Sequence, residues 1–198
     1  NEVDYIAIHY TANPGATAQN NRDYFENLAT THEAKVSSHF VVGLEGEVIQ
    51  CIPTSEMSYA TNSRNVDSIS IECCHNDETG VFEQATYDST VKLTAWLCAR
   101  FGLTSEQVIR HYDVTGKECP KYYVDHPDAW EQMKADIAAQ ITVDQGLMGI
   151  SEILLCIALQ KNCRINKIFS ILKYLWKYCS IKKNCMTGGS WEYPQGVQ

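Results

Sequence analysis

The chain has 198 residues, of which 44% are hydrophobic and 20% are charged, and its formal net charge is −8. The ordinary apolar share excludes disorder as the main state, and the net negative charge excludes a general attraction to nucleic-acid phosphates. The length fits one globular domain with a small appendage.

Charge is distributed unevenly along the chain. Residues 1–142 carry 9 basic and 21 acidic side chains, a net −12, whereas residues 143–198 carry 7 basic and 3 acidic side chains, a net +4. This asymmetry predicts two units with different partners, although a basic solvated helix face would look the same. The longest apolar stretch, Ile150 to Leu159, is shorter than the roughly 20 residues of a membrane span, so we expect a soluble protein.

The nine cysteines are too loosely spaced for a disulfide scaffold. Their number is odd, and no pair has C-x-x-C spacing. Free or metal-bound thiols are therefore expected.

The first half of the chain predicts four strands and one helix. Residues 3–10 are rich in β-branched and aromatic side chains, and they end at a turn with His9 close to the end of the strand. A helix is expected over residues 20–30, followed by strands at 38–43 and 48–52 joined by a hairpin. The strand at 68–72 alternates, with Ile69 and Ile71 on one face and three polar residues, Ser68, Ser70 and Glu72, on the other.

The second half of the chain predicts mainly helices. One helix covers residues 87–101 and is closed by Gly102. Thr104 and Gln107 form a capping-box pattern for a short helix before His111. A further helix is expected over residues 127–141, with Trp130, Met133, Ile137 and Ile141 spaced three and four apart.

These elements predict an α/β fold with a central mixed β-sheet flanked by helices and a small C-terminal helical unit. Residues 1–142 form the expected first domain, and residues 143–149, with two glycines, the expected linker. Residues 150–186 are expected to form a helical hairpin, and residues 187–198 a flexible tail.

Three residues form a candidate metal site: His9 at a strand end, His111, and Cys119. Seven residues separate His111 from Cys119. Two imidazoles and one thiolate suit zinc, and three protein ligands leave a fourth position open for water. Six histidines and nine cysteines offer many such triples by chance, so the spacing alone does not decide the matter.

The residues around these positions carry a family resemblance. Four segments resemble, in the same order, the motifs of the zinc-dependent N-acetylmuramoyl-L-alanine amidases, a family related to T7 lysozyme and the peptidoglycan recognition proteins: Ile6–His9, Val36–Val42, Ser68–Glu72, and Arg110–Asp113 with Gly116–Pro120. The resemblance covers about 140 of the 198 residues. It extends to amidase domains of endolysins and autolysins from Gram-positive bacteria and their phages.

The resemblance implies a role for each matched position. His9, His111 and Cys119 match the zinc ligands. Glu72 matches the carboxylate that works as general base, and Lys117 matches a lysine that aids catalysis. Zinc held in this way can lower the pKa of a bound water toward about 7 and polarise an amide carbonyl.

Two positions depart from the family pattern. Ser38 stands where some members have a tyrosine before the His-Phe pair, which leaves more of the proton transfer to Glu72. Tyr59 stands where many relatives have a histidine lining the cleft, so it is a candidate substrate-binding residue. His39 lies on an apolar strand and is expected to have a structural or supporting role. We expect the remaining histidines, among them His75, at the surface.

The implied reaction is hydrolysis of the amide bond between the lactyl group of N-acetylmuramic acid and the L-alanine of the stem peptide in peptidoglycan. A non-catalytic binding module of the same fold and an amidase that recycles soluble muropeptides are the alternatives. The C-terminal helices are expected to bind the wall, with self-association as the main alternative and membrane contact less favoured. No secretory signal opens the sequence, which fits either cytoplasmic accumulation with release to the wall, as for a phage endolysin, or a processed autolysin.

Overall fold

The computed structural model describes residues 2–160. The chain divides into two units, residues 1–148 and residues 149–198. All the strands found within residues 2–160, and all the candidate site residues, belong to the first unit. Most of the C-terminal helical unit expected over 150–186, and the tail expected over 187–198, lie outside the described residues.

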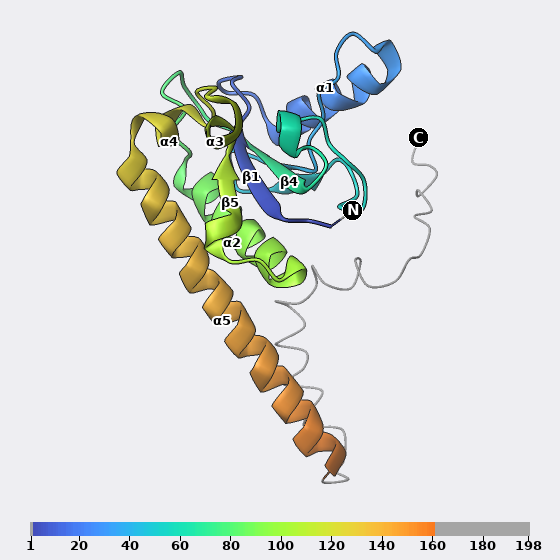
Figure 1. Cartoon of the computed structure of the whole chain (residues 1–198), viewed down its shortest axis with the longest axis vertical. Helices are drawn as coiled ribbons and strands as arrows, with labels where there is room; N and C mark the ends of the chain where they lie inside the picture. Colours follow the sequence, from blue (N-terminus) through green and yellow to red (C-terminus); the bar gives the residue numbers. More distant parts are fainter. Residues whose placement is uncertain (1, 161–198) are drawn as a thin grey trace, which may run out of the picture. The chain divides into compact units, whose positions relative to one another are not determined.

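The first unit is built on a mixed five-stranded sheet with the strand order β3-β2-β4-β1-β5. Its strands are β1 (Tyr5–Tyr10), β2 (Phe40–Val42), β3 (Val48–Gln50), β4 (Ser68–Cys73) and β5 (Val108–Arg110). Strands β2, β4, β1 and β5 pair in parallel, and β3 pairs antiparallel with β2. The predicted α/β fold class with a mixed sheet is therefore confirmed (Figure 1).

The larger core lies on the sheet face that α2 (Gln84–Phe101) and α5 (Pro127–Gln160) cover. Ile69 and Ile71 of β4 point into it, in agreement with the predicted alternation. The side chains of α5 that were expected to face the core do so and are buried: Trp130, Met133, Ile137 and Ile141. Burying side chains of this size contributes about 1.5–3 kcal/mol each, and this fixes the α2–α5 layer on the sheet.

The opposite face of the sheet carries a smaller core and helix α1 (Ala18–Thr31). Thr17 caps the start of α1, since its Oγ1 accepts from the backbone N–H of Asn20. Ala18 and Phe25 of this helix pack against Val41 and Cys74. The residues of β1 and β4 that alternate with the large core point toward this side, where the site residues gather.

Short elements complete the unit. They are the 3₁₀ helices η1 (Asn62–Arg64) and η2 (Ser105–Gln107), and the helices α3 (His111–Thr115) and α4 (Lys121–Asp125). The capping box of Thr104 and Gln107 is present, and it opens η2. Strand β5 and helices α3 and α4 are not predicted from the sequence, because elements of three to five residues are too short to show a periodic hydrophobic pattern.

Helix α5 is longer than expected. It starts at Pro127 as predicted but continues through residues 143–149, where the sequence predicts a linker. An internal glycine costs only about 1 kcal/mol relative to alanine in a helix, so Gly146 does not end the helix. Within residues 2–160, no helix is long and apolar enough to span a membrane.

Candidate metal centre and cavity

Three elements bring the candidate ligands together at one edge of the sheet. His9 is close to the end of β1, and His111 follows β5 directly as the first residue of α3. Because β1 and β5 are parallel neighbours with Ile8 opposite Arg110, their carboxyl ends meet at this edge. Cys119 lies in the loop after α3. A 3.0 Å hydrogen bond from the Tyr112 N–H to the Cys119 carbonyl closes this loop.

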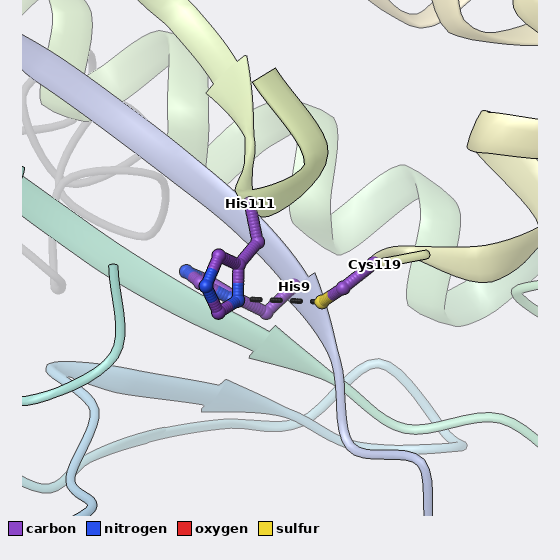
Figure 2. A group of neighbouring side chains, drawn as sticks. All are labelled: His9, His111 and Cys119. Carbon is purple, nitrogen blue, oxygen red and sulfur yellow. Dashed lines mark hydrogen bonds between the residues drawn. The ribbon is translucent and has the colours of Figure 1, made fainter. Parts of the chain in front are cut away.

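The three side chains are close enough to share one metal ion. One possible ligand atom from each of His9, His111 and Cys119 lies within 4.8 Å of the other two. The Sγ of Cys119 is 3.7 Å from Nδ1 of His9, and the two imidazole centroids are 4.9 Å apart (Figure 2). All three residues are buried, with exposed fractions of 1%, 7% and 2% respectively.

Burial sets the protonation of these groups. It lowers the pKa of His9 to about 3, with further lowering by His111 and Lys117, and it also lowers the pKa of His111. Both imidazoles are therefore neutral at pH 7 and keep a lone pair for a metal. Burial raises the pKa of the Cys119 thiol to about 12, so a bound cation would have to displace its proton. Two neutral imidazoles and a sulfur fit the donor set of a catalytic zinc site.

Glu72 lies beside these residues on the neighbouring strand. Strand β4 places it in register with His9, and its side chain lines the same cavity. Burial raises the pKa of Glu72 to about 8, although the charge of Lys117 opposes this shift. Its buried Oε2 has no hydrogen-bond partner among residues 2–160. A carboxyl group with a pKa near neutrality can both accept and return a proton.

Lys117 lies at the same cavity, in the loop between α3 and Cys119. Its backbone is held at both ends: its N–H donates to Thr115 Oγ1 at 3.2 Å, and its carbonyl accepts from the Cys119 N–H at 2.7 Å. Its positive charge influences the pKa of Glu72 and of all three candidate ligands. The Lys117 side chain therefore contributes positive charge to the cavity.

The cavity has a volume of about 580 Å³, which is enough for a small ligand or a segment of a polymer. It contains all three candidate ligands, Glu72 and Lys117. Tyr59 lines it with a side chain that is 43% exposed, and Lys35 Nζ lies 6.0 Å from the centre of the Tyr59 ring. The structure thus places Tyr59 where a bound substrate could touch it.

His39 and Ser38 lie in the core, away from the cavity lining. Nδ1 of His39 accepts from the Ser70 N–H at 3.0 Å, and Nε2 lies 3.0 Å from the Glu56 carbonyl. Ser38 Oγ lies within 3.1 Å of the carbonyls of Phe40 and Ser70. Both ring nitrogens of His39 are thus occupied by the protein. Ser38 ties β2 to β4.

His75 differs from the expectation that it lies at the surface. It is only 1% exposed, and its ring stacks on Tyr10 at 5.1 Å between centroids. Its turn-like sequence context does not reveal this packing, because the partner is distant in sequence.

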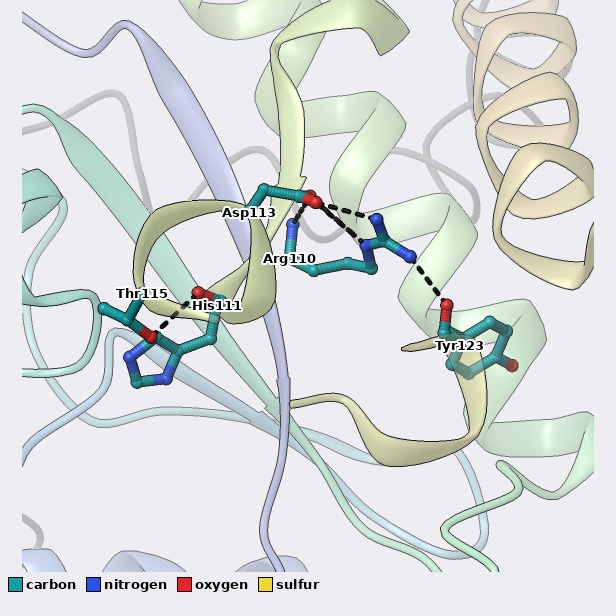
Figure 3. A network of polar contacts seen from close by, with 5 residues as sticks. All are labelled: Arg110, His111, Asp113, Thr115 and Tyr123. Atoms are coloured by element: carbon teal, nitrogen blue, oxygen red, sulfur yellow. Dashed lines mark hydrogen bonds and ion pairs between the residues drawn. The ribbon is translucent and has the colours of Figure 1, made fainter. Parts of the chain in front are cut away.

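A separate network fixes the short helix that carries His111. Asp113 accepts from the backbone N–H of Arg110 at 2.8 Å and pairs with its guanidinium at 2.7 Å. The other end of that guanidinium donates to the Tyr123 carbonyl at 2.8 Å, and Thr115 Oγ1 donates to the His111 carbonyl at 3.3 Å (Figure 3). Arg110 thereby ties α3 to α4, and His111 has little freedom to move.

Two residues that contact the ligands are not apparent from the sequence. Thr61 Oγ1 lies 3.2 Å from Nε2 of His9, and Asn62 Oδ1 lies 2.7 Å from Nε2 of His111. Both are about 50 residues from the histidines they touch. The only signal in the sequence is the polar run Thr61–Asn65, which is equally typical of an ordinary surface turn.

Comparison with known proteins identifies relatives of the first unit. Residues 1–122 match the family described as N-acetylmuramoyl-L-alanine amidase. The N-acetylmuramoyl-L-alanine amidase CwlL of Bacillus licheniformis is 37% identical over 135 residues, which are 62% of this chain and 37% of CwlL. The N-acetylmuramoyl-L-alanine amidase XlyA of Bacillus subtilis is 34% identical over 139 residues, which are 67% of this chain and 43% of XlyA.

Solved structures give the same result. The catalytic domain of XlyA has 30% sequence identity and a TM-score of 0.58, with 69% of this chain and 86% of that domain covered. PlyL has 25% identity and a TM-score of 0.61, with 70% of this chain and 86% of PlyL covered. The chain spans less than half the length of the curated relatives CwlL and XlyA, and the similarity lies in the unit that holds the cavity.

Proposed function

The chain belongs to the N-acetylmuramoyl-L-alanine amidase family, and on this premise we propose that it hydrolyses peptidoglycan. The bond cleaved is the amide between the lactyl group of N-acetylmuramic acid and the L-alanine of the stem peptide. The observation that carries this proposal is the convergence of His9, His111 and Cys119 beside Glu72 in one cavity. Strands β1 and β4, the start of α3 and the loop after it bring these groups together.

The proposed cofactor is zinc, held by His9, His111 and Cys119. Bound zinc would polarise the amide carbonyl and lower the pKa of a coordinated water toward about 7. The neutral imidazoles and the buried thiol support this choice over magnesium or calcium, which prefer oxygen ligands.

Glu72 is the proposed proton carrier. Its Oε2 has no competing hydrogen bond among the described residues, so it can take a proton from the attacking water as the new C–O bond forms. The same atom then gives this proton to the alanine nitrogen as the C–N bond breaks. General acid–base transfer of this kind contributes about 10²–10⁴ in rate. Ser38 cannot share the work, because it is buried between β2 and β4.

Lys117 is the proposed electrostatic partner of the reaction. Attack on the amide carbon places negative charge on the carbonyl oxygen, and the ammonium group at the cavity can stabilise it. Removing one such stabilising group costs about 10²–10³ in rate. Tyr59 and the cavity wall beside it are proposed to contact the substrate.

Digestion of purified peptidoglycan by the zinc-loaded protein tests the proposal. New amino groups of L-alanine without new reducing sugar ends are the expected products. Cys119→Ala and Glu72→Gln should lose this activity, whereas the matched variants Cys51→Ala and Glu131→Gln, which change residues outside the cavity lining, should keep it.

Other products would redirect the proposal. Reducing ends would indicate a glycosidase. Release of neither product from several wall types would point to a non-catalytic binding module. Turnover of soluble muropeptides without turnover of intact walls would indicate an amidase that acts in recycling.

The C-terminal part has a proposed role in targeting. Residues 143–198 carry a net +4 against −12 for residues 1–142, which supports attraction to anionic wall polymers. Wall binding that falls with added salt would support this role. Binding that salt does not change would exclude the electrostatic basis of this role, and absence of wall binding would exclude the role itself and leave self-association as the main alternative. Action at the wall after release from the cytoplasm, or as a processed autolysin, stays a prediction.

A further inference from the structure

The turn Thr61–Asn65 contacts the Nε2 atoms of both candidate histidine ligands. Nε2 of His111 lies 2.7 Å from the amide oxygen of Asn62, and Nε2 of His9 lies 3.2 Å from the hydroxyl of Thr61. An amide oxygen can only accept a hydrogen bond. In the neutral ring, therefore, Nε2 of His111 carries the proton and Nδ1 has the free lone pair.

The contacts of His9 fit the same tautomer. Nδ1 of His9 lies 3.7 Å from Cys119 Sγ, on the side of the candidate metal site, and the Thr61 hydroxyl can accept a hydrogen bond from Nε2. Thr61 is fully buried, so water does not compete for its hydroxyl. Both rings are thus oriented with Nδ1 as the nitrogen available to a metal.

The backbone of this turn is arranged to present the two side chains. Asn62 has a φ of +54°, a left-handed conformation that asparagine tolerates better than most residues. Asn65 Oδ1 accepts from the N–H groups of Ala60 and Thr61 at 3.1 and 2.6 Å, and the N–H of Asn65 donates to the Asn62 carbonyl at 3.1 Å. The turn is therefore rigid enough to hold an amide oxygen against His111.

We propose that Asn62 and Thr61 are positioning residues that fix both histidines in the Nε2–H tautomer and so present Nδ1 of each ring to the metal. This inference rests on the metal centre of the proposed function. Partners that accept a hydrogen bond from the far nitrogen of a ligating histidine orient the ring, and losing one typically weakens metal binding about 10–100-fold.

Substitution of Asn62 separates the hydrogen bond from the backbone conformation. Asn62→Gly removes the amide, and glycine adopts a φ of +54° without steric cost. Asn62→Asp keeps an acceptor at the same distance from the backbone and should restore the wild-type behaviour. His32→Gly is the matched control, since His32 also has a positive φ, of +57°, but is exposed at the end of α1.

The tautomer is read from nitrogen-15 NMR spectra of the imidazoles in the metal-free protein. The pH is about 7.5, about one unit above the ordinary pKa of histidine. We expect Nδ1 of His111 to be the unprotonated nitrogen in the wild type, in Asn62→Asp and in His32→Gly. Asn62→Gly should show a mixture of the two tautomers. An unchanged tautomer in Asn62→Gly would overturn the role of Asn62.

Zinc affinity gives a second readout that does not depend on activity. In competition with a chromophoric chelator, Asn62→Gly should bind zinc about 10–100-fold more weakly than the wild type, and Asn62→Asp and His32→Gly should stay within a few-fold of it. Affinity of Asn62→Gly within twofold of the wild type would contradict the proposal. Failure of the wild type itself to bind zinc would instead remove the metal centre, while the tautomer experiment would still decide what Asn62 does.

Thr61 is tested in the same way through His9. Thr61→Val removes the hydroxyl at nearly constant volume, and Thr61→Ser keeps it. The valine variant should lose the Nε2–H preference of His9 and the serine variant should retain it. Equal spectra for the two variants would overturn the role of Thr61.

Discussion

Replacing Glu72 by glutamine should stabilise the metal-free protein by an amount that depends on pH. Glu72 is half-buried, its buried Oε2 has no hydrogen-bond partner within residues 2–160, and burial raises its pKa from 4.5 to about 8. The unfolded chain exposes this group to water and returns its pKa to the ordinary value. At a pH between these two pKa values, folding therefore takes up a proton at Glu72.

The sign and the size follow from this difference. Between pH 4.5 and pH 8 the unfolded chain releases a proton that the folded protein retains, so the free energy of unfolding falls as the pH rises. At pH 7, about 2.5 units above the ordinary pKa of 4.5, the free energy of unfolding has fallen by about 3 kcal/mol. The side chain is partly open to the cavity, and screening by water reduces the expected effect to about 1–3 kcal/mol. Glutamine carries no titrating group and is free of this loss.

The assay is urea unfolding of the chelator-treated, reduced protein at pH 5, 6, 7 and 8, followed by tryptophan fluorescence. The stability of Glu72→Gln relative to the wild type should rise steadily across this range. His9 and His111 also have shifted pKa values, but they are present in both proteins and largely cancel in the difference. Glu131→Gln, at an exposed position of α5, should show no such trend. A difference between Glu72→Gln and the wild type that is constant from pH 5 to pH 8 would refute the reasoning.

Three further predictions concern catalysis, metal and packing. Lys117→Gln should lower kcat about 10²–10³-fold with a small change in KM, because it removes a charge that stabilises the oxyanion. A change confined to KM in steady-state assays would indicate a binding role instead. Removing zinc with a chelator should lower the Tm measured by calorimetry, and free zinc at about 100 times its Kd should restore about 3 kcal/mol of stability. An unchanged Tm would argue against a metal that binds the folded state. Met133→Ala should lower the free energy of unfolding by about 2–5 kcal/mol, since Met133 is fully buried between α5 and the sheet; a loss below 1 kcal/mol in urea unfolding would mean that α5 contributes little to the core.

Much of the fold and the candidate metal centre follow from local patterns in the sequence. The alternation of Ile69 and Ile71 with Glu72 places the carboxyl group on the face opposite the main core, and the structure agrees. The spacing in α5 identifies its buried face, because a helix repeats every 3.6 residues whatever lies beside it. The shared site of His9, His111 and Cys119 is predicted by the resemblance of the surrounding motifs to the amidase family, since spacing alone leaves it open, and these three residues do lie together.

The tertiary structure alone decides how those residues are held. Strand β5 has three residues and α3 has five, and elements this short form because neighbouring parts of the chain pack against them. Asn62 and His111 are 49 positions apart, and no local pattern connects them. The length of α5 through Gly146 likewise depends on a small difference between helix and turn propensities. Sequence thus determines which residue types are present and how each segment tends to fold. Contacts between distant segments determine which partners face the ring nitrogens of His9 and His111 and leave Oε2 of Glu72 without a partner within residues 2–160.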